Sequence, residues 1–333
     1  MQHNRRAFIK QIGMGIAGAG VASTIPQALF ANTAKKDMFF KLALSQFSLA
    51  SDFWTGKLKA LDFPAKVKKD FDITGLDYCS MFFADKAKDA TFLADLKQRS
   101  ADAGTYNLRI MVDGEGVLGD LNEATRLKAV DNHHKWIDAA ATLGCPMIRV
   151  NVEGEGNPDD VAKAATDSLH RLIDYGKKSK VDVIVENHVG ISCNGGWLAG
   201  VMKQVDSKHC GTLADFGNFC INRTKPEEQT IAAYMKTKCL EEYDRYKGIA
   251  ELMPFAKGVH AKTHLFDANG NDTETDFVKM FTIIKNSGFK GWVSIEYEGG
   301  SFKMYKPDSP YLGNDDGVKA TKALVEKVTA AMA

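Results

Sequence analysis

The chain has 333 residues, of which 44% are hydrophobic and 26% are charged, so it can bury a large core and its composition excludes an intrinsically disordered protein. Forty-three basic and forty-two acidic residues give a formal net charge of +1. A chain without a strong overall field is not expected to recruit nucleic acid or an anionic membrane. These bounds favour a small ligand that is recognised locally.

The N-terminal residues differ in kind from the rest of the chain. The arginine pair Arg5-Arg6 is followed by an apolar run rich in glycine and alanine from Ile12 to Ala22. Charged, apolar and small residues in this order are typical of an export signal, and the arginine pair resembles a twin-arginine signal. The apolar run is too short to span a membrane. We expect a signal peptide over residues 1–34, recognition by the twin-arginine translocase, a periplasmic or secreted protein, and no stable membrane insertion.

The cysteine pattern bears on whether the exported protein contains disulfides. Six cysteines are an even number in an exported chain, which would permit disulfides. They show no C-x-x-C spacing, several lie in apolar segments, and a protein that folds in the reducing cytoplasm completes its core without disulfides. We therefore predict that the cysteines are unpaired. They are Cys79, Cys145, Cys193, Cys210, Cys220 and Cys239.

After the signal, short β-rich apolar runs alternate with longer amphipathic stretches. The predicted strands are Leu42–Phe47, Gly75–Phe82, Leu108–Asp113, Met147–Val152, Val181–His188, Gly211–Asp215, Gly258–Thr263 and Trp292–Glu296. The predicted helices between them include Asp89–Ala103, Asn122–Leu143, Asp159–Lys177, Thr230–Met253 and Asp276–Ser287. Such alternation with nearly continuous apolar strands favours a parallel sheet covered by helices.

The number of units favours a closed barrel over an open sheet. Eight strand–helix units indicate an α/β protein with a (β/α)₈ TIM barrel, whereas an open doubly wound sheet usually has five or six strands and a Gly-rich dinucleotide turn. Gly114-Glu115-Gly116 and Gly154-Glu155-Gly156 lack the third glycine of that turn. No linker divides the remaining chain. We expect a single barrel domain over residues 38–333.

Polar residues at the strand ends are the candidate site residues, because the C-terminal ends of barrel strands converge on one mouth. Four successive predicted strands place a carboxylate or an imidazole after an apolar run, at Glu186, Asp215, His260 and Glu296. Such groups would be unfavourable in a core unless something neutralised them. Three carboxylates with one imidazole suit Mn²⁺ or Mg²⁺, and they tolerate Co²⁺ or Zn²⁺. We therefore predict a divalent metal site.

The residues alone do not decide which histidine of the seventh strand would bind the metal. Period-two alternation places His260, Lys262 and His264 on one face, so either histidine could bind the metal. Lys262 and His188 would then lie near the metal as cations or hydrogen-bond donors, able to neutralise an enolate oxygen or to act as an acid.

Other roles are open for the neighbouring polar residues. Lys262 could equally form a salt bridge to Glu298 or Asp215. Arg149 and Asn151 share a face of the fourth strand and could bind substrate hydroxyls.

The same segments carry a family resemblance. They resemble the xylose isomerase-like TIM-barrel superfamily, the sugar phosphate isomerase/epimerase family, in a branch with twin-arginine signals. The resemblance covers the whole barrel and rests on Glu186–Ser192, Trp197-Leu198, Gly211–Phe219, Ala261-Lys262-Thr263, Phe266-Asp267 and Ile295–Gly299.

This resemblance implies roles for individual residues. It implies that Glu186, Asp215, His260 and Glu296 bind the metal, because the superfamily places the histidine ligand first in its His-x-Lys pattern. It implies that Glu186 and Glu296 transfer the proton, and the placement of Lys262 and His188 described above leads us to expect that they assist. Asn218 stands where many sugar epimerases of the superfamily have a histidine, so we expect it, with Arg149, Asn151 and His264, to contact substrate in its own way.

The expected function is a metal-dependent isomerase or epimerase that acts on an unphosphorylated sugar or keto-sugar by proton transfer through an enediolate. Export argues against a phosphosugar, which cells keep inside. Two alternatives stay open: a 3-keto-glycoside lyase that eliminates the aglycone at the same site, and a non-catalytic sugar-binding barrel. The expected partner is a small sugar, and a homo-oligomer is left open.

Overall fold

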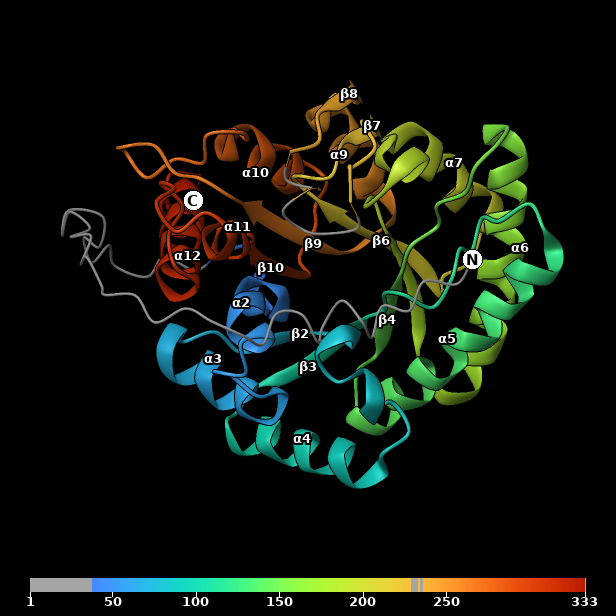
Figure 1. The fold of residues 1–333 in the computed structure, drawn as a ribbon, viewed down its shortest axis with the longest axis horizontal. Helices are drawn as coiled ribbons and strands as arrows, with labels where there is room; N and C mark the ends of the chain where they lie inside the picture. Colours follow the sequence, from blue (N-terminus) through green and yellow to red (C-terminus); the bar gives the residue numbers. More distant parts are fainter. Residues whose placement is uncertain (1–37, 229–232, 234–235, 333) are drawn as a thin grey trace.

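The computed structural model describes residues 38–228, 233 and 236–332, and the predicted signal peptide lies outside them. Eight parallel strands close into a barrel, which confirms the predicted (β/α)₈ fold (Figure 1). All eight overlap the predicted strands. They are β1 (Lys41–Ser45), β2 (Gly75–Cys79), β3 (Tyr106–Met111), β4 (Met147–Val150), β5 (Asp182–Glu186), β6 (Cys210–Asp215), β9 (Ala256–Thr263) and β10 (Trp292–Tyr297).

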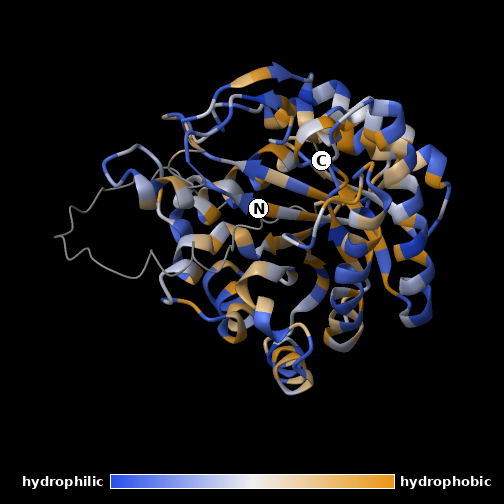
Figure 2. Cartoon of the chain, turned by 45° about the vertical axis from the view of Figure 1, so that its right-hand side comes forward, coloured by the Kyte–Doolittle hydropathy of each residue, from blue (hydrophilic) through white to orange (hydrophobic). Residues whose placement is uncertain are grey.

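Helices surround the barrel and carry both hydrophobic and hydrophilic residues along their length (Figure 2). The longer ones are α3 (Phe63–Phe71), α4 (Ala90–Asp102), α5 (Glu123–Leu143), α6 (Pro158–Gly176), α7 (Gly195–Val205), α9 (Arg245–Leu252), α10 (Phe277–Asn286) and α12 (Asn314–Ala330). Two shorter helices, α2 (Ala50–Trp54) and α11 (Gly299–Tyr305), follow β1 and β10. Asparagine side chains cap α5 and α6 at Asn122 and Asn157, which fixes where these helices begin. No helix in the described part of the chain is long and apolar enough to cross a membrane.

Two register shifts in the barrel matter for the site. In the β2–β3 pair the register shifts between Leu76 and Asp77, so that Asp77 lies opposite Arg109. In the β6–β9 pair the shift falls just after Thr212, and Asp215 then lies opposite His260. A bulge adds one residue to one strand and redirects the side chains that follow it. Both shifts therefore help to set which polar side chains meet inside the barrel.

An antiparallel hairpin of β7 (Cys220–Arg223) and β8 (Cys239–Glu242) is inserted between β6 and β9. A disulfide joins Cys220 to Cys239, so the prediction that all cysteines are unpaired is wrong for this pair. The other four cysteines are free and buried. The predicted helix over Thr230–Met253 is also wrong in part, because the described residues of this segment form β8 and then α9. Cys239 lies in β8 of this segment, opposite Arg223, and its disulfide therefore joins the two strands of the hairpin.

Candidate metal centre

Four side chains meet at the C-terminal ends of β5, β6, β9 and β10. Glu186, Asp215, His260 and Glu296 each offer one ligand atom, and these atoms all lie within 4.8 Å of one another. None of the four residues is more than 4% exposed. Atoms on opposite sides of one divalent ion are separated by about twice the metal–ligand distance, or roughly 4–5 Å. The spacing of the cluster therefore suits a single ion.

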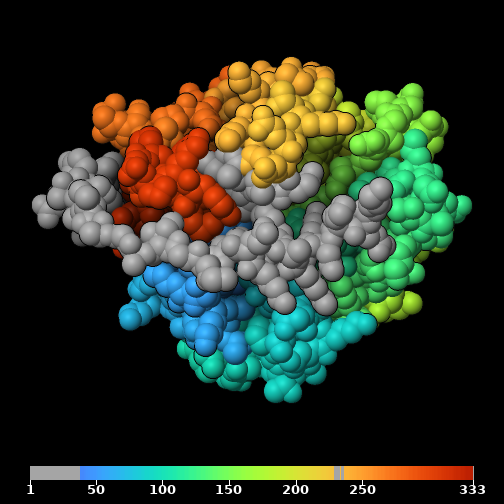
Figure 3. All heavy atoms as spheres, in the orientation of Figure 1, coloured from blue at the N-terminus to red at the C-terminus, as the bar shows by residue number. Residues whose placement is uncertain are grey.

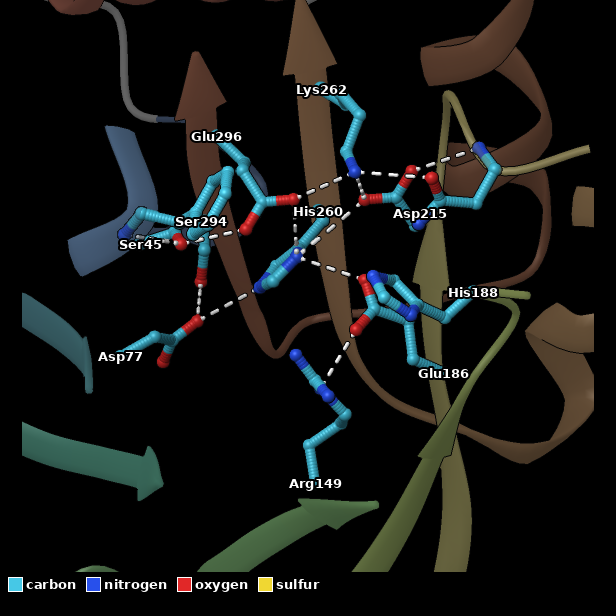
Figure 4. Close-up of polar contacts among 12 residues, drawn as sticks. Ser45, Asp77, Arg149, Glu186, His188, Asp215, His260, Lys262, Ser294 and Glu296 are labelled. Atoms are coloured by element: carbon cyan, nitrogen blue, oxygen red, sulfur yellow. Dashed lines mark hydrogen bonds and ion pairs between the residues drawn. The ribbon is translucent and has the colours of Figure 1, made fainter. Parts of the chain in front are cut away.

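His260 lies at the centre of the cluster (Figure 4). Its Nδ1 atom is 3.4 Å from Glu186 Oε1, 3.6 Å from Asp215 Oδ2 and 3.3 Å from Glu296 Oε2. Neither His260 Nδ1 nor Asp215 Oδ2 has a hydrogen-bond partner, although both atoms are buried. Leaving buried polar atoms unpaired is costly, and coordination to a cation would satisfy both of them. The donor set therefore fits a divalent metal.

The electrostatics of His260 also indicate a cation at this point. Burial opposes a charged ring, yet the surrounding carboxylates, Glu296 foremost, raise the pKa of His260 well above its usual value. The carboxylates thus favour a positive charge at the position of Nδ1. A metal ion would replace the proton there, because only the neutral nitrogen can bind a metal.

His264, the alternative ligand, lies outside this cluster. Its Nδ1 is 3.3 Å from Glu274 Oε2, and its Nε2 is 3.3 Å from Glu298 Oε2. Burial opposes protonation, but the hydrogen bonds to Glu274 and Glu298 raise the pKa of His264 to about 10. Both ring nitrogens therefore face carboxylates other than the four clustered groups, and the geometry favours His260 as the ligand.

Lys262 forms both of the salt bridges that were open to it. Its Nζ is 2.8 Å from Glu298 Oε1 and 3.4 Å from Asp215 Oδ2, and it also lies 3.1 Å from Glu296 Oε2. It donates a hydrogen bond to Asn218 Oδ1 at 3.1 Å. Burial disfavours its charge, but these carboxylates raise the pKa of Lys262 well above its usual value. The lysine is a fixed cation beside the cluster.

Arg149 is a second fixed cation, on the opposite side of Glu186 (Figure 4). Its Nε lies 2.8 Å from Glu186 Oε2, and its Nη1 donates to Asp113 Oδ1 at 2.9 Å. Asn151 donates to the same Asp113 oxygen at 3.0 Å. Arg149 is 4% exposed. The structure thus brings Arg149 and Asn151 to the mouth as predicted, with Arg149 already paired to two carboxylates.

The charges of these groups leave an excess of negative charge that a divalent ion would reduce. Six carboxylates and three cations leave three net negative charges when His260 is neutral. A buried charge without compensation is expensive, so this balance favours a bound cation. The carboxylates are those of Asp113, Glu186, Asp215, Glu274, Glu296 and Glu298, and the cations are Arg149, Lys262 and His264.

Several buried polar atoms at the strand ends have no hydrogen-bond partner. They follow β1, β4, β5 and β6 and are Gln46 Nε2, Glu153 Oε2, His188 Nδ1 and Asn218 Nδ2. Hydroxyl groups of a sugar are the kind of partner that such donors and acceptors take. His188 and Asn218 were predicted site residues, and Glu153 was not. Burial raises the pKa of Glu153, and its place three residues after β4 was the signal in the sequence.

Two further residues that the sequence did not single out hold the ligands in place. Ser45 Oγ donates to Glu296 Oε1 at 2.7 Å from the end of β1. Asn187 accepts a hydrogen bond from Asp215 N at 2.8 Å and donates to Asp215 O at 3.0 Å. These bonds tie the ends of β1 to β10 and of β5 to β6. The Glu296 carboxylate and the backbone of Asp215 are therefore held by neighbours on adjacent strands.

Comparison with known proteins places the chain in a family. Residues 72–324 match the family described as xylose isomerase-like TIM barrel, and the chain belongs to this family. A search of curated proteins finds no matching sequence.

Solved structures share the fold at low sequence identity. A sugar phosphate isomerase/epimerase from Parabacteroides distasonis is 17% identical, with a TM-score of 0.61 over 91% of this chain and 98% of its own. The 3-keto-D-glucoside 4-epimerase YcjR from E. coli is 14% identical, with a TM-score of 0.59 over 86% and 99%. The IolI protein, solved with a zinc atom, is 13% identical, with a TM-score of 0.60 over 88% and 99%.

Proposed function

We propose that this protein is a metal-dependent isomerase or epimerase acting on an unphosphorylated sugar or keto-sugar. The observation that carries the proposal is the placement of Glu186 and Glu296 on opposite sides of His260, both directed at the same centre (Figure 4). Two carboxylates that face one point from opposite sides can remove a proton from one face of a carbon and return it on the other. Structural neighbours that are sugar isomerases and epimerases support this reading.

Glu186, Asp215, His260 and Glu296 would hold the ion. A divalent ion at this position would polarise the carbonyl of the sugar and stabilise the negative charge that develops on its oxygen. Each glutamate keeps one oxygen toward the centre while its other oxygen is held, in Glu186 by Arg149 and in Glu296 by Ser45. This arrangement fixes the direction from which each carboxylate can reach a proton.

The cation of Lys262 completes the proposed machinery. Its Nζ lies 3.1 Å from Glu296, so it is close enough to donate a hydrogen bond to an oxygen of a substrate beside that carboxylate. His188, with an unpaired Nδ1, would contact substrate from the neighbouring side. Asn218 has a free Nδ2 for the same purpose, while its Oδ1 accepts from Lys262.

The lyase reading remains the second candidate, and the fold likeness to a 3-keto-glucoside epimerase favours it over pure binding. A ketone at C3 acidifies the proton at C2, and loss of that proton can expel the group at C1 by β-elimination. Glu296 would then act as the base, and Lys262 beside it would donate to the departing oxygen.

Incubation of keto-sugars and 3-keto-glycosides with the metal-loaded protein in heavy water tests the proposal. An isomerase or epimerase should place deuterium on the carbon next to the carbonyl and leave any glycoside intact. Release of the aglycone would favour the lyase. Binding of the sugar without any deuterium uptake would contradict both enzyme readings and support a binding barrel.

We also propose that the protein is exported through its twin-arginine signal and works outside the cytoplasm. The disulfide between Cys220 and Cys239 supports this proposal, because disulfides persist mainly in oxidising compartments. Replacing both Arg5 and Arg6 with lysine should leave a precursor in the cytoplasm. Normal export of that variant would refute the assignment.

A further inference from the structure

A second buried polar group lies deeper in the barrel, beneath the four clustered ligands. Asp77 on β2 and Arg109 on β3 are at most 1% exposed, and Asp77 Oδ1 accepts a hydrogen bond from Arg109 Nε at 2.8 Å. Barrel interiors are ordinarily filled by branched apolar side chains. An ion pair at this depth is costly unless its groups are well paired, so its presence calls for a role.

The other oxygen of Asp77 reaches across the barrel to the metal-binding strands. Asp77 Oδ2 lies 3.2 Å from His260 Nε2 on β9, and it accepts a hydrogen bond from Ser294 Oγ on β10 (Figure 4). His260 therefore has Asp77 on one ring nitrogen and the ligand carboxylates on the other. An Nε2–H that is donated to Asp77 leaves Nδ1 with a lone pair directed at the centre of the cluster.

The surroundings are shaped to keep Asp77 in this position. The register shift in β2–β3 places Asp77 directly opposite Arg109. On the far side, Gly258 of β9 leaves room for the guanidinium, because a Cβ atom at Gly258 would lie 2.0 Å from Arg109 Nη1. Gly258 is two residues before His260, so the strand that carries the ligand also makes space for the cation that holds Asp77.

We propose that Asp77 is the positioning residue of the metal centre: it fixes the tautomer and the ring orientation of His260, and Arg109, Ser294 and Gly258 hold it in place. This inference rests on the proposed metal centre and extends it below the ligands. Carboxylates that accept from a metal-bound histidine orient the ring and raise its basicity, and their loss typically weakens metal binding 10- to 100-fold.

The test uses the mature full-length protein and Zn²⁺ alone, with the dissociation constant measured by competition against a chelating dye. The double substitution Asp77→Leu with Arg109→Met removes both charges together, so that neither is left buried and unpaired. We expect zinc binding about 10- to 100-fold weaker, with the thermal unfolding of the metal-free protein close to that of the unsubstituted protein. Equal zinc affinity in the folded double variant would overturn the proposal.

Two single variants separate positioning from general structure. Gly258→Ala leaves every ligand and Asp77 unchanged but displaces Arg109, so it should weaken zinc binding in the same direction. Ser168→Ala, which removes a buried hydrogen bond to Leu118 O outside the cluster, should leave zinc affinity within about twofold. Equal losses in the two single variants would point to a general structural effect and against the proposal.

A measurement on the unsubstituted protein decides the case even if the double variant fails to fold. Nitrogen NMR of histidine-labelled, zinc-loaded protein should show His260 with zinc on Nδ1 and a hydrogen on Nε2. Zinc on Nε2 would overturn the proposal while leaving the metal centre intact. Absence of zinc binding by the unsubstituted protein would instead overturn the metal centre itself, and with it this inference.

Discussion

The half of the barrel mouth formed by β5, β6, β9 and β10 supplies all four clustered ligands, whereas the half formed by β1 to β4 supplies none of them. That second half instead contributes groups that contact the ligand side chains. Ser45 donates a hydrogen bond to Glu296, and Arg149 forms an ion pair with Glu186. Ligands gathered on one side would leave the other side of a bound ion open, as a catalytic metal requires for its substrate. All four clustered ligands thus come from one half of the mouth, and the other half contributes groups that orient them.

Substitution within the ligand half should have the largest effect. Glu296→Gln keeps the size and one oxygen of the side chain but removes the base, so we expect metal retention with a loss of turnover on the order of 10²–10⁴. Deuterium uptake and metal content, measured on the same sample, check this outcome.

Glu298→Gln is the matched control for that variant. Glu298 lies two residues further along the chain and also contacts Lys262, but it is not one of the clustered ligands. We expect less than a tenfold loss. Full activity in the metal-loaded Glu296→Gln protein would show that the base is another residue. It would contradict the catalytic role proposed for this ligand.

In the half formed by β1 to β4, the main expected effect of Arg149→Met is a lower free energy of unfolding. It leaves Glu186 and Asp113 without their shared cation, and breaking a fully buried pair costs about 3–5 kcal/mol. Because Asp113 is partly exposed, we expect roughly 2–4 kcal/mol in the free energy of unfolding, measured by urea titration.

The control for this variant is Arg171→Met, which breaks an exposed pair with Asp167 and should cost less than about 1 kcal/mol. Equal costs in the two variants would mean that Arg149 is not held in a buried network.

The pH dependence of stability tests the ion pairs of His264, which lie outside the cluster in the same half of the mouth. Folding raises the pKa of His264 to about 10 from an ordinary value near 6.5, so its contribution is fully present below about pH 6.5 and is lost as the pH rises toward 10. His264→Gln should therefore lower the free energy of unfolding at pH 6 by an amount on the order of a few kcal/mol, and the difference should shrink by pH 9.5.

Urea titrations at several pH values measure this difference. His134→Gln is the control, because burial lowers the pKa of His134 and its contribution cannot fade in that direction with rising pH. A difference for His264→Gln that stays constant from pH 6 to 9.5 would argue against the ion pairs with Glu274 and Glu298.

The smallest effect is expected at Ser45, whose hydroxyl holds one oxygen of Glu296. Ser45→Ala removes one hydrogen bond to a charged group, worth about 1.5 kcal/mol at the lower end of the usual range, so kcat/KM should fall roughly tenfold. Ser168→Ala, which removes a buried hydrogen bond to Leu118 O outside the cluster, is the control and should have little effect on kcat/KM. A loss of kcat/KM in Ser45→Ala as large as that in Glu296→Gln would contradict the assignment of an orienting role to Ser45.

The four clustered ligands could be predicted from the sequence because their signal is local. Each of Glu186, Asp215, His260 and Glu296 ends or interrupts an apolar run, and a charge in that place is unusual whatever the rest of the chain does. The strands themselves were predictable for the same reason, since their apolar character and their spacing are properties of short segments.

The orienting half depends on closure of the barrel and could not be predicted in this way. Ser45 meets Glu296 across 251 positions of sequence, and Asp77 meets His260 across 183. A serine is ordinary in a strand, and the charge of Asp77 within an apolar strand does not by itself indicate which distant residue it meets. Arg149 and Asn151 were found at the mouth, but the occupation of Arg149 by Asp113 and Glu186 follows from the neighbouring strands.

The β7–β8 hairpin is inserted in the chain between two adjacent strands that carry clustered ligands, and it does not interrupt their pairing, since β6 and β9 remain hydrogen-bonded neighbours. Its base is closed by a hydrogen bond from Tyr243 N to Phe219 O, and its two strands are joined by the disulfide. Figure 3 shows this region, in yellow, on the surface of the molecule. Because this segment is closed at its own base and its described residues supply none of the clustered ligands, its length could change without altering the pairing of the two strands that flank it.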